Sequence, residues 1–174
     1  MGERQGQEEA PVFERECAVY AFLLGYARRL VADIDDAQFA DQPTPGVNHP
    51  AWLLGHLAIS TDFAATKFGL APCQPRSWFK DFSSGSFPRP DRASYPGKAE
   101  LMAAYEAGHE RVEKAALAAT PEAMDQPHGL EIAGLKEALP TVGHLVVHLM
   151  TAHEASHLGH LSNWRRQKGL PFLF

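Results

Sequence analysis

Histidine is the residue type in this chain whose number and spacing point most directly to chemistry. The chain holds nine histidines among 174 residues, and five of them lie in the segment 144–160. Two histidines four residues apart on a helix can direct both imidazoles at one metal ion. His153 and His157 form such a pair, and so do His144 and His148. A chain with nine histidines carries such a pair by chance about as often as not, so spacing alone does not identify a metal site.

The helical phase of the last segment distinguishes the two pairs. At about 100° per residue, His157 lies about 40° and His160 about −20° around the helix from His153. The apolar residues within about 60° of His153 by this arithmetic are Val142, Val146, Leu149, Met150 and Trp164. His153, His157 and His160 are therefore predicted to lie in the middle of a buried stripe. Buried imidazoles cost free energy unless they find partners, and a metal ion satisfies several of them at once.

His144 and His148 fall on the opposite side of the same helix, so they are predicted to be dispensable for metal binding. A third ligand is expected from the helix predicted over about residues 48–69. The apolar residues that share the face of His56 on that helix are Trp52, Ile59 and Phe63. A buried histidine alone is more often a hydrogen-bonded core residue than a ligand. Combined with the pair on the last helix, His56 is interpreted as the third ligand.

Amphipathic helices must position these histidines. Apolar residues three and four apart predict a first helix from Phe13, and three more over about residues 48–69, 98–119 and 140–168. No segment shows the sustained period-two alternation of a strand. The pattern predicts an all-α fold, a four-helix bundle in a single domain covering residues 1–174.

The ends of two helices carry recognisable signals. Asn48 or His49 can cap exposed amides at the start of the second helix, with Pro50 suited to its first turn. Pro140 and Thr141 open the last helix, and the glycine after Lys168 is its expected left-handed terminator. Residues 1–11 are polar and are expected to be frayed.

The segment 71–97 is rich in proline and serine but also in aromatic residues, which favours a long crossover packed along the body over disorder. Its basic residues, Arg76, Lys80, Arg89 and Arg92, outnumber Asp81 and Asp91. This basic excess could bind a carboxylate on a thiol cofactor or a substrate. A solvated loop is the simpler interpretation.

The composition excludes several classes of protein. Sixteen basic and 21 acidic residues give a net charge of −5, which offers no general attraction to nucleic acid or to an anionic membrane surface. No apolar run approaches the ~20 residues of a membrane span. Two cysteines cannot form a disulfide scaffold and favour a reducing cytoplasm.

Two segments carry a family resemblance. NHPAWLLGHLA (48–58) and PTVGHLVVHLMTAHEASHLGHLSNWRRQKGLP (140–171) resemble the DinB/YfiT-like metalloenzyme superfamily. The resemblance implies a four-helix bundle of up–down–down–up topology, often dimeric. It also implies a divalent metal, commonly nickel or zinc, held by His56, His153 and His157. Where this chain has His160, the family often has glutamine.

The resemblance implies metal-dependent chemistry without fixing the reaction. Relatives include S-transferases and isomerases that use low-molecular-weight thiols, and others resemble hydrolases. We expect a homodimer that transfers a small thiol to an electrophilic small molecule, with the thiol bound to the metal as thiolate and His160 as proton acceptor or fourth ligand. A metal-dependent hydrolase, and a non-catalytic metal-binding or interaction bundle, are the alternatives. Glu154 is expected to be a solvated helix residue.

Overall fold

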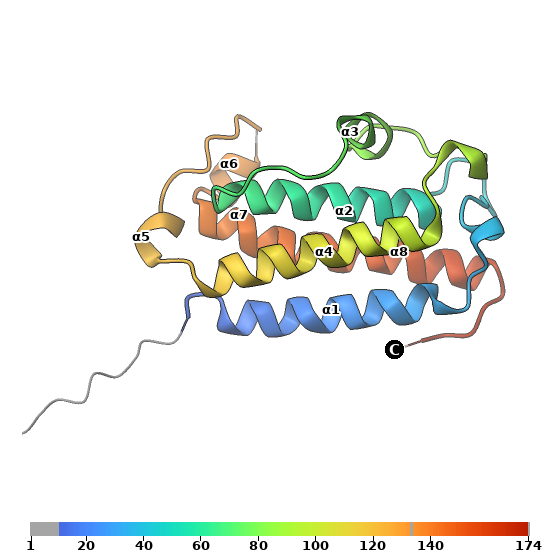
Figure 1. Cartoon of the computed structure of the whole chain (residues 1–174), viewed down its shortest axis with the longest axis horizontal. Coiled ribbons are helices and arrows are strands. Elements are labelled where there is room, and N and C mark those ends of the chain that lie inside the picture. Colours follow the sequence, from blue (N-terminus) through green and yellow to red (C-terminus); the bar gives the residue numbers. More distant parts are fainter. Residues whose placement is uncertain (1–10, 133, 174) are drawn as a thin grey trace, which may run out of the picture.

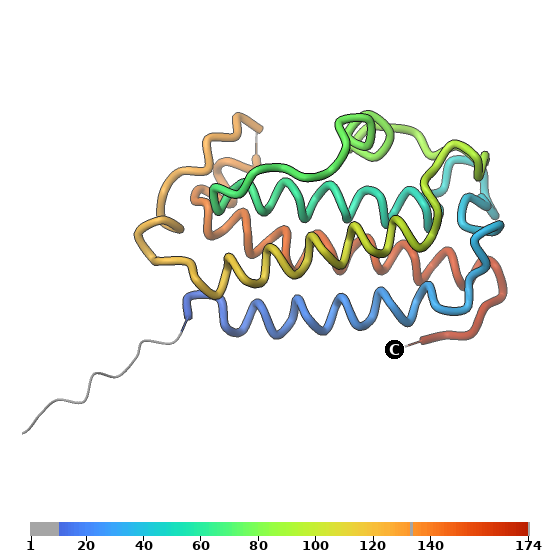
Figure 2. Tube along the Cα trace, viewed as in Figure 1, coloured from blue at the N-terminus to red at the C-terminus, as the bar shows by residue number. Residues whose placement is uncertain are grey.

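The computed structural model describes residues 11–132 and 134–173, and within them all regular structure is helical (Figure 1). The long elements are α1 (Glu14–Ala32), α2 (Pro50–Lys67), α4 (Lys98–Leu117) and a continuous run of α7 (Val142–His148), η3 (Leu149–His153) and α8 (Glu154–Gln167). The all-α prediction is confirmed. The four stretches lie side by side, with α1 and the last run pointing one way and α2 and α4 the other (Figure 2). The expectation for residues 1–11 lies almost wholly outside the described residues.

Helix α2 is the most enclosed of these elements. Fourteen of its eighteen residues are buried, because α4, α3 and the last helical run all pack against it. A helix that is apolar on all sides is expected in such a position. The sequence predicted one buried face on this helix, the face that carries His56. The structure buries most of the helix on all sides.

The capping signals of the sequence form as expected. The His49 side chain accepts a hydrogen bond from the Trp52 backbone N–H (3.2 Å), and Pro50 occupies the first turn of α2. Thr141 caps α7 by accepting from the backbone N–H of His144. Gly169 follows α8 with φ of 71°, a left-handed conformation that favours glycine.

The crossover is not structureless. It contains α3 (Arg76–Phe82) and the short 3₁₀ turn η2 (Arg92–Ser94), and Trp78 and Phe82 of α3 are buried in the main core. Elsewhere lie the shorter elements η1 (Asp36–Gln38), α5 (Pro121–Met124) and α6 (Leu135–Ala138). The crossover thus packs along the body, as predicted, and α3 packs against α2 (Figure 1).

The last run is α-helical except for η3, where five residues form a π-helical turn. A π turn places about one residue more in the turn than an α-helix does. The buried residues of α7 include Val142 and Val146. After the π turn the buried residues are Glu154, Leu158, Leu161, Trp164 and Arg165. The buried stripe of α8 is therefore moved by one residue from the predicted one, which ran through His153, His157 and His160.

Candidate metal centre

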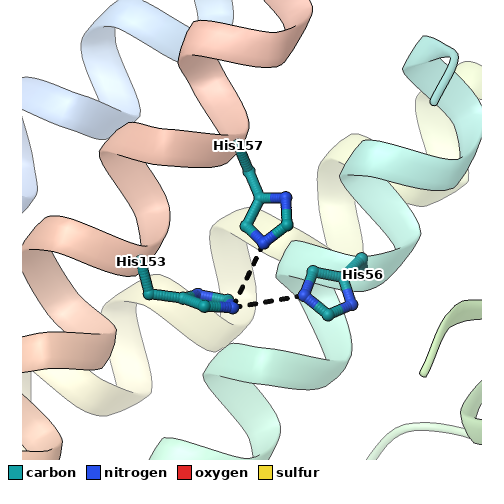
Figure 3. Close-up of side chains that lie close together, drawn as sticks. All are labelled: His56, His153 and His157. Atoms are coloured by element: carbon teal, nitrogen blue, oxygen red, sulfur yellow. Dashed lines mark hydrogen bonds between the residues drawn. The ribbon is translucent and has the colours of Figure 1, made fainter. Parts of the chain in front are cut away.

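Three histidines from two helices converge on one point. The Nε2 atom of His153 lies 3.2 Å from Nε2 of His56 and 3.2 Å from Nε2 of His157 (Figure 3). Zinc–nitrogen bonds of about 2.0–2.1 Å in a tetrahedral site place ligand nitrogens about 3.3 Å apart. Among the described residues, these three are the group of histidine, cysteine and acidic side chains whose ligand atoms come together closely enough to hold an ion. The donor set and spacing fit a divalent metal.

The sequence around His56 explains how that ring is oriented. Its Nδ1–H donates to the Phe82 carbonyl (2.7 Å), which leaves the Nε2 lone pair directed at the triad. The Trp52 ring stacks on the imidazole at 4.9 Å with an interplanar angle of 6°. The carbonyl is within reach because Gly55 has no side chain: a Cβ there would stand 2.4 Å from the Phe82 ring. Gly159 differs from Gly55: it is exposed, and a Cβ there would meet no atom within 4 Å.

All three rings favour the neutral form that binds metal. Burial lowers the pKa of His56, and it lowers the pKa of His153 to about 4 and of His157 to about 3. Charge repulsion between neighbouring imidazoles adds to the effect at His153 and His157. A neutral imidazole presents a lone pair, so no proton has to leave before an ion binds near neutral pH.

The π turn sets how deep the histidines lie. His153 and His157 are half-buried and His160 is exposed, so the prediction that all three lie mid-stripe is wrong. Because the turn shifts their phase by about one residue, they border the core instead of filling it. Half-burial gives these two histidines a side that faces the surface.

The π turn also places His148 differently from the prediction. Its ring centroid lies 6.0 Å from that of His153, so it is beside the triad and not on the opposite side of the helix. The α-helical arithmetic placed it wrongly because five residues at π spacing rotate less than five at α spacing. His144 is exposed and bonds Thr141, away from the triad. His160 lies on the other flank, 5.8 Å between ring centroids from His157.

Glu154 is the residue whose environment the sequence interpretation missed. Expected to be solvated, its side chain is 1 % exposed. It accepts from Tyr105 Oη (2.5 Å) and lies 3.0 Å from Nε2 of His109, whose ring stacks on Tyr20. The one-residue shift of the buried stripe explains the error, and the apolar stripe of α4 around Tyr105 was the signal for His109, which is buried beside it.

Residues 153–157 read HEASH, the H-E-x-x-H spacing of zinc metalloproteases in which the glutamate acts as general base. In the structure both carboxylate oxygens of Glu154 are engaged by His109, and Tyr105 donates to one of them. The chain has the spacing of that motif, but its glutamate is bonded within the core toward α4.

A pocket of about 370 Å³ opens beside two of the ligands. His56 and His153 form part of its wall, and the rest comes from α2, the α3 region and η3. A larger groove of about 470 Å³ is lined by His144 and His148 but by none of the three ligands. His160 lines a third, smaller pocket. Of these three pockets, the first is the one lined by histidines of the triad.

The basic residues of the crossover are not brought to this pocket. Arg92 bonds Asp36 (2.6 Å), and Arg89 lies 3.5 Å from Asp81. Arg76 and Lys80 are exposed residues of α3, and none of the four lines the pocket beside the triad. The simpler interpretation of the basic residues, as part of a solvated loop, fits this arrangement.

These features define a class: all-helical proteins in which histidines from two facing helices create a three-nitrogen metal site. The family model of the DinB superfamily matches residues 23–161 of this chain. The chain belongs to the DinB superfamily. No curated protein matches it. No helix of the described residues is both long and apolar enough to cross a membrane.

Proposed function

We propose that the chain is a divalent-metal-dependent enzyme that transfers a small thiol to an electrophilic substrate. The observation that carries the proposal is the triad itself: three neutral imidazole nitrogens converge beside a pocket of about 370 Å³. Three protein ligands leave coordination positions for a reactant, whereas structural sites are closed by four.

We also propose that the long helices constitute the up–down–down–up bundle that the resemblance implies, which their directions in Figure 1 support.

The protein groups have distinct roles in this proposal. His56, His153 and His157 would hold zinc or nickel, and such an ion supplies the Lewis acidity that lowers the pKa of a bound thiol. The exposed His160 would accept the thiol proton and release it to solvent. The carbon–sulfur bond forms as the bond from that carbon to its leaving group breaks, and the leaving group departs with the electron pair.

The alternative is a metal-dependent hydrolase, because the same arrangement can activate water. The H-E-x-x-H spacing favours it, but the buried Glu154 carboxylate is bonded to Tyr105 and His109. A hydrolase on this scaffold would need a different base, for which His160 is the nearest exposed imidazole to the triad on α8. We therefore rank hydrolysis second, and a non-catalytic metal-binding bundle third.

Purified protein should be assayed for metal content and imaged by anomalous scattering, which identifies the ion and its ligands together. Metal-loaded protein should then be tested with several low-molecular-weight thiols against generic electrophiles, and in parallel with ester and amide substrates. Thiol-dependent product supports the proposal. Hydrolysis without thiol rejects it in favour of the hydrolase, and no turnover by fully loaded protein favours the non-catalytic bundle.

His160 can be tested separately from the triad. We expect His160→Gln, which restores the residue common in the family, to keep metal and fold. If His160 accepts the proton, turnover falls and the pH optimum shifts. An unchanged pH profile would remove His160 from the mechanism.

We also propose a homodimer, supported by the exposed Val19 and Phe22 on α1; sedimentation velocity tests it.

A further inference from the structure

The pocket beside the triad has walls without formal charge. Its lining residues are His56, Ile59, Ser60, Phe63, Phe79, Ser83, Ser84, Leu149 and His153. None is an aspartate, glutamate, lysine or arginine. Phe63 and Phe79 supply aromatic surface from two different helices. The volume is within the range of small-molecule sites, about 300–1,000 Å³.

Two of the three serine hydroxyls of this pocket are oriented as acceptors. Ser60 Oγ donates its proton to the His56 carbonyl (2.7 Å), and Ser83 Oγ donates to the Phe79 carbonyl. Since each hydroxyl has one proton, both oxygens turn only lone pairs toward other groups. Lone pairs suit an N–H or O–H of a ligand and repel a carboxylate. Burying an unpaired charge in such surroundings is costly.

The two arginines of the crossover that lie nearest along the chain, Arg89 and Arg92, are already paired with other groups of the protein. Arg92 is held by Asp36 through both Nε and Nη2, and also by the Tyr95 carbonyl. Arg89 is paired with Asp81 and lies over the Tyr95 ring. The residues that line the pocket therefore offer an anionic substrate no protein cation, and a cationic one no carboxylate. Lys67, whose Nζ lies 4.5 Å from the Phe63 ring centroid, lines a different groove.

We propose that this pocket binds the electrophilic substrate as a neutral, largely aromatic or aliphatic molecule whose polar group is a hydrogen-bond donor. The proposal rests on the proposed function in treating the occupant as substrate. Phe63, Phe79, Ile59 and Leu149 hold the apolar body, and the oxygens of Ser60 and Ser83 accept from the donor group. Selectivity between neutral and charged molecules is thus a property of the pocket walls.

Two probes of equal size test the selectivity: 4-methylbenzamide, which is neutral and carries N–H donors, and 4-methylbenzoate, which is anionic. Both are titrated by calorimetry into zinc-loaded protein and into chelator-treated protein, since a carboxylate can also bind the ion directly. We expect the amide to bind at least about ten-fold more tightly to chelator-treated protein, a difference of about 1.4 kcal/mol. Equal or tighter binding of the benzoate to that form overturns the proposal.

Substitutions locate the probe in the pocket. Phe63→Ala should weaken amide binding about ten-fold through lost aromatic contact, whereas Phe68→Ala, a half-buried phenylalanine that lines a different groove, should not. Ser84→Lys adds a cation at an exposed position of the lining and should strengthen benzoate binding several-fold without changing that of the amide. Amide binding that survives Phe63→Ala places the probe elsewhere, such as the groove beside His144, and overturns the proposal.

Turnover separates this inference from the proposed function. Zinc-loaded protein and a thiol are offered 4-(chloromethyl)benzamide or 4-(chloromethyl)benzoate, which differ only in charge and donor capacity. Higher kcat/KM for the benzamide supports both proposals. Thiol transfer that favours the benzoate leaves the proposed function standing and overturns the inference. Selective amide binding without any thiol transfer leaves the binding selectivity standing and overturns the proposed function.

Discussion

The three ligand histidines differ in what holds the nitrogen that faces away from the triad. Nδ1 of His56 is fixed by the Phe82 carbonyl. Nδ1 of His153 and of His157 is buried and has no hydrogen-bond partner among the described residues. The orientation of His56 is therefore set by the fold, whereas an ion would contribute to fixing the other two rings.

His153 is the central ligand, because its Nε2 lies 3.2 Å from that of each of the other two. We expect His153→Ala to lose stoichiometric metal, since two imidazoles remain where three bound the ion. Metal content after gel filtration, measured by atomic emission, checks this. His144→Ala is the control, because His144 is exposed on the same helical run and bonds Thr141. Retention of metal by the His153 variant, or its loss from the His144 variant, would contradict the assignment.

At the scale of the elements, the glycine at position 55 allows α3 to pack closely against α2. A Cβ at Gly55 would stand 2.4 Å from the Phe82 ring, and the Phe82 carbonyl orients His56. We expect Gly55→Ala to push α3 away and weaken metal binding about ten-fold, as losses of outer-shell partners do. A competition titration with a chromophoric chelator measures the affinity.

Gly159→Ala makes the same chemical change on α8, where nothing lies within 4 Å. It should leave metal affinity unchanged and stabilise the helix by about 0.5–1 kcal/mol. Equal metal affinities of the two variants would show that the contact of α3 with α2 does not govern the orientation of His56.

The N-cap of α2, His49, predicts that the free energy of unfolding depends on pH. His49 is fully buried, and burial lowers its pKa from 6.5 to about 4. The unfolded chain therefore binds more protons than the folded one between pH 4 and 6.5, so stability falls as the pH drops through this window and is level above it. The pKa difference corresponds to about 3 kcal/mol.

His49→Asn keeps a capping side chain without a titrating group. Urea unfolding of chelator-treated protein at pH 7 and pH 4.5 measures the dependence, and the variant should lose less stability on acidification than the parent. Because His56, His153 and His157 titrate in both proteins, the difference isolates His49. Parallel pH profiles of the two proteins would contradict a buried, neutral His49.

The helices and their caps could be predicted because they depend on local signals: apolar spacing, His49 before Pro50, and Gly169 after the last turn. The proximity of His56, His153 and His157 could be predicted from the same spacing and from the resemblance. The π turn could not, since no residue type in Leu149–His153 specifies it, and arithmetic at 100° per residue assumes an unbroken α-helix. The misplacement of His148 and the burial of Glu154 both follow from that one turn.

For the molecule as a whole, we expect metal binding and folding to be coupled. The triad joins α2 to the last helical run, elements nearly 100 residues apart in sequence, so an ion that binds only the folded chain stabilises it. At free metal 100-fold above Kd the gain is about 2.7 kcal/mol, or about 5–10 °C in Tm for a chain of this size. Differential scanning fluorimetry with and without a chelator measures it. A Tm that chelation leaves unchanged would contradict the coupling.

The π turn also has a genetic consequence. A π turn is equivalent to one inserted residue in an α-helix, and the exposed Ala152 lies inside it. Loss of that single codon would give a regular α-helix whose two halves share one phase. The residues in register with Val142 and Val146 would still be Glu154 and Leu158, because the turn accommodates the one residue that is lost. Within this family fold, the turn is therefore a place in the last helix where one codon can be lost in frame while Glu154 still faces α4.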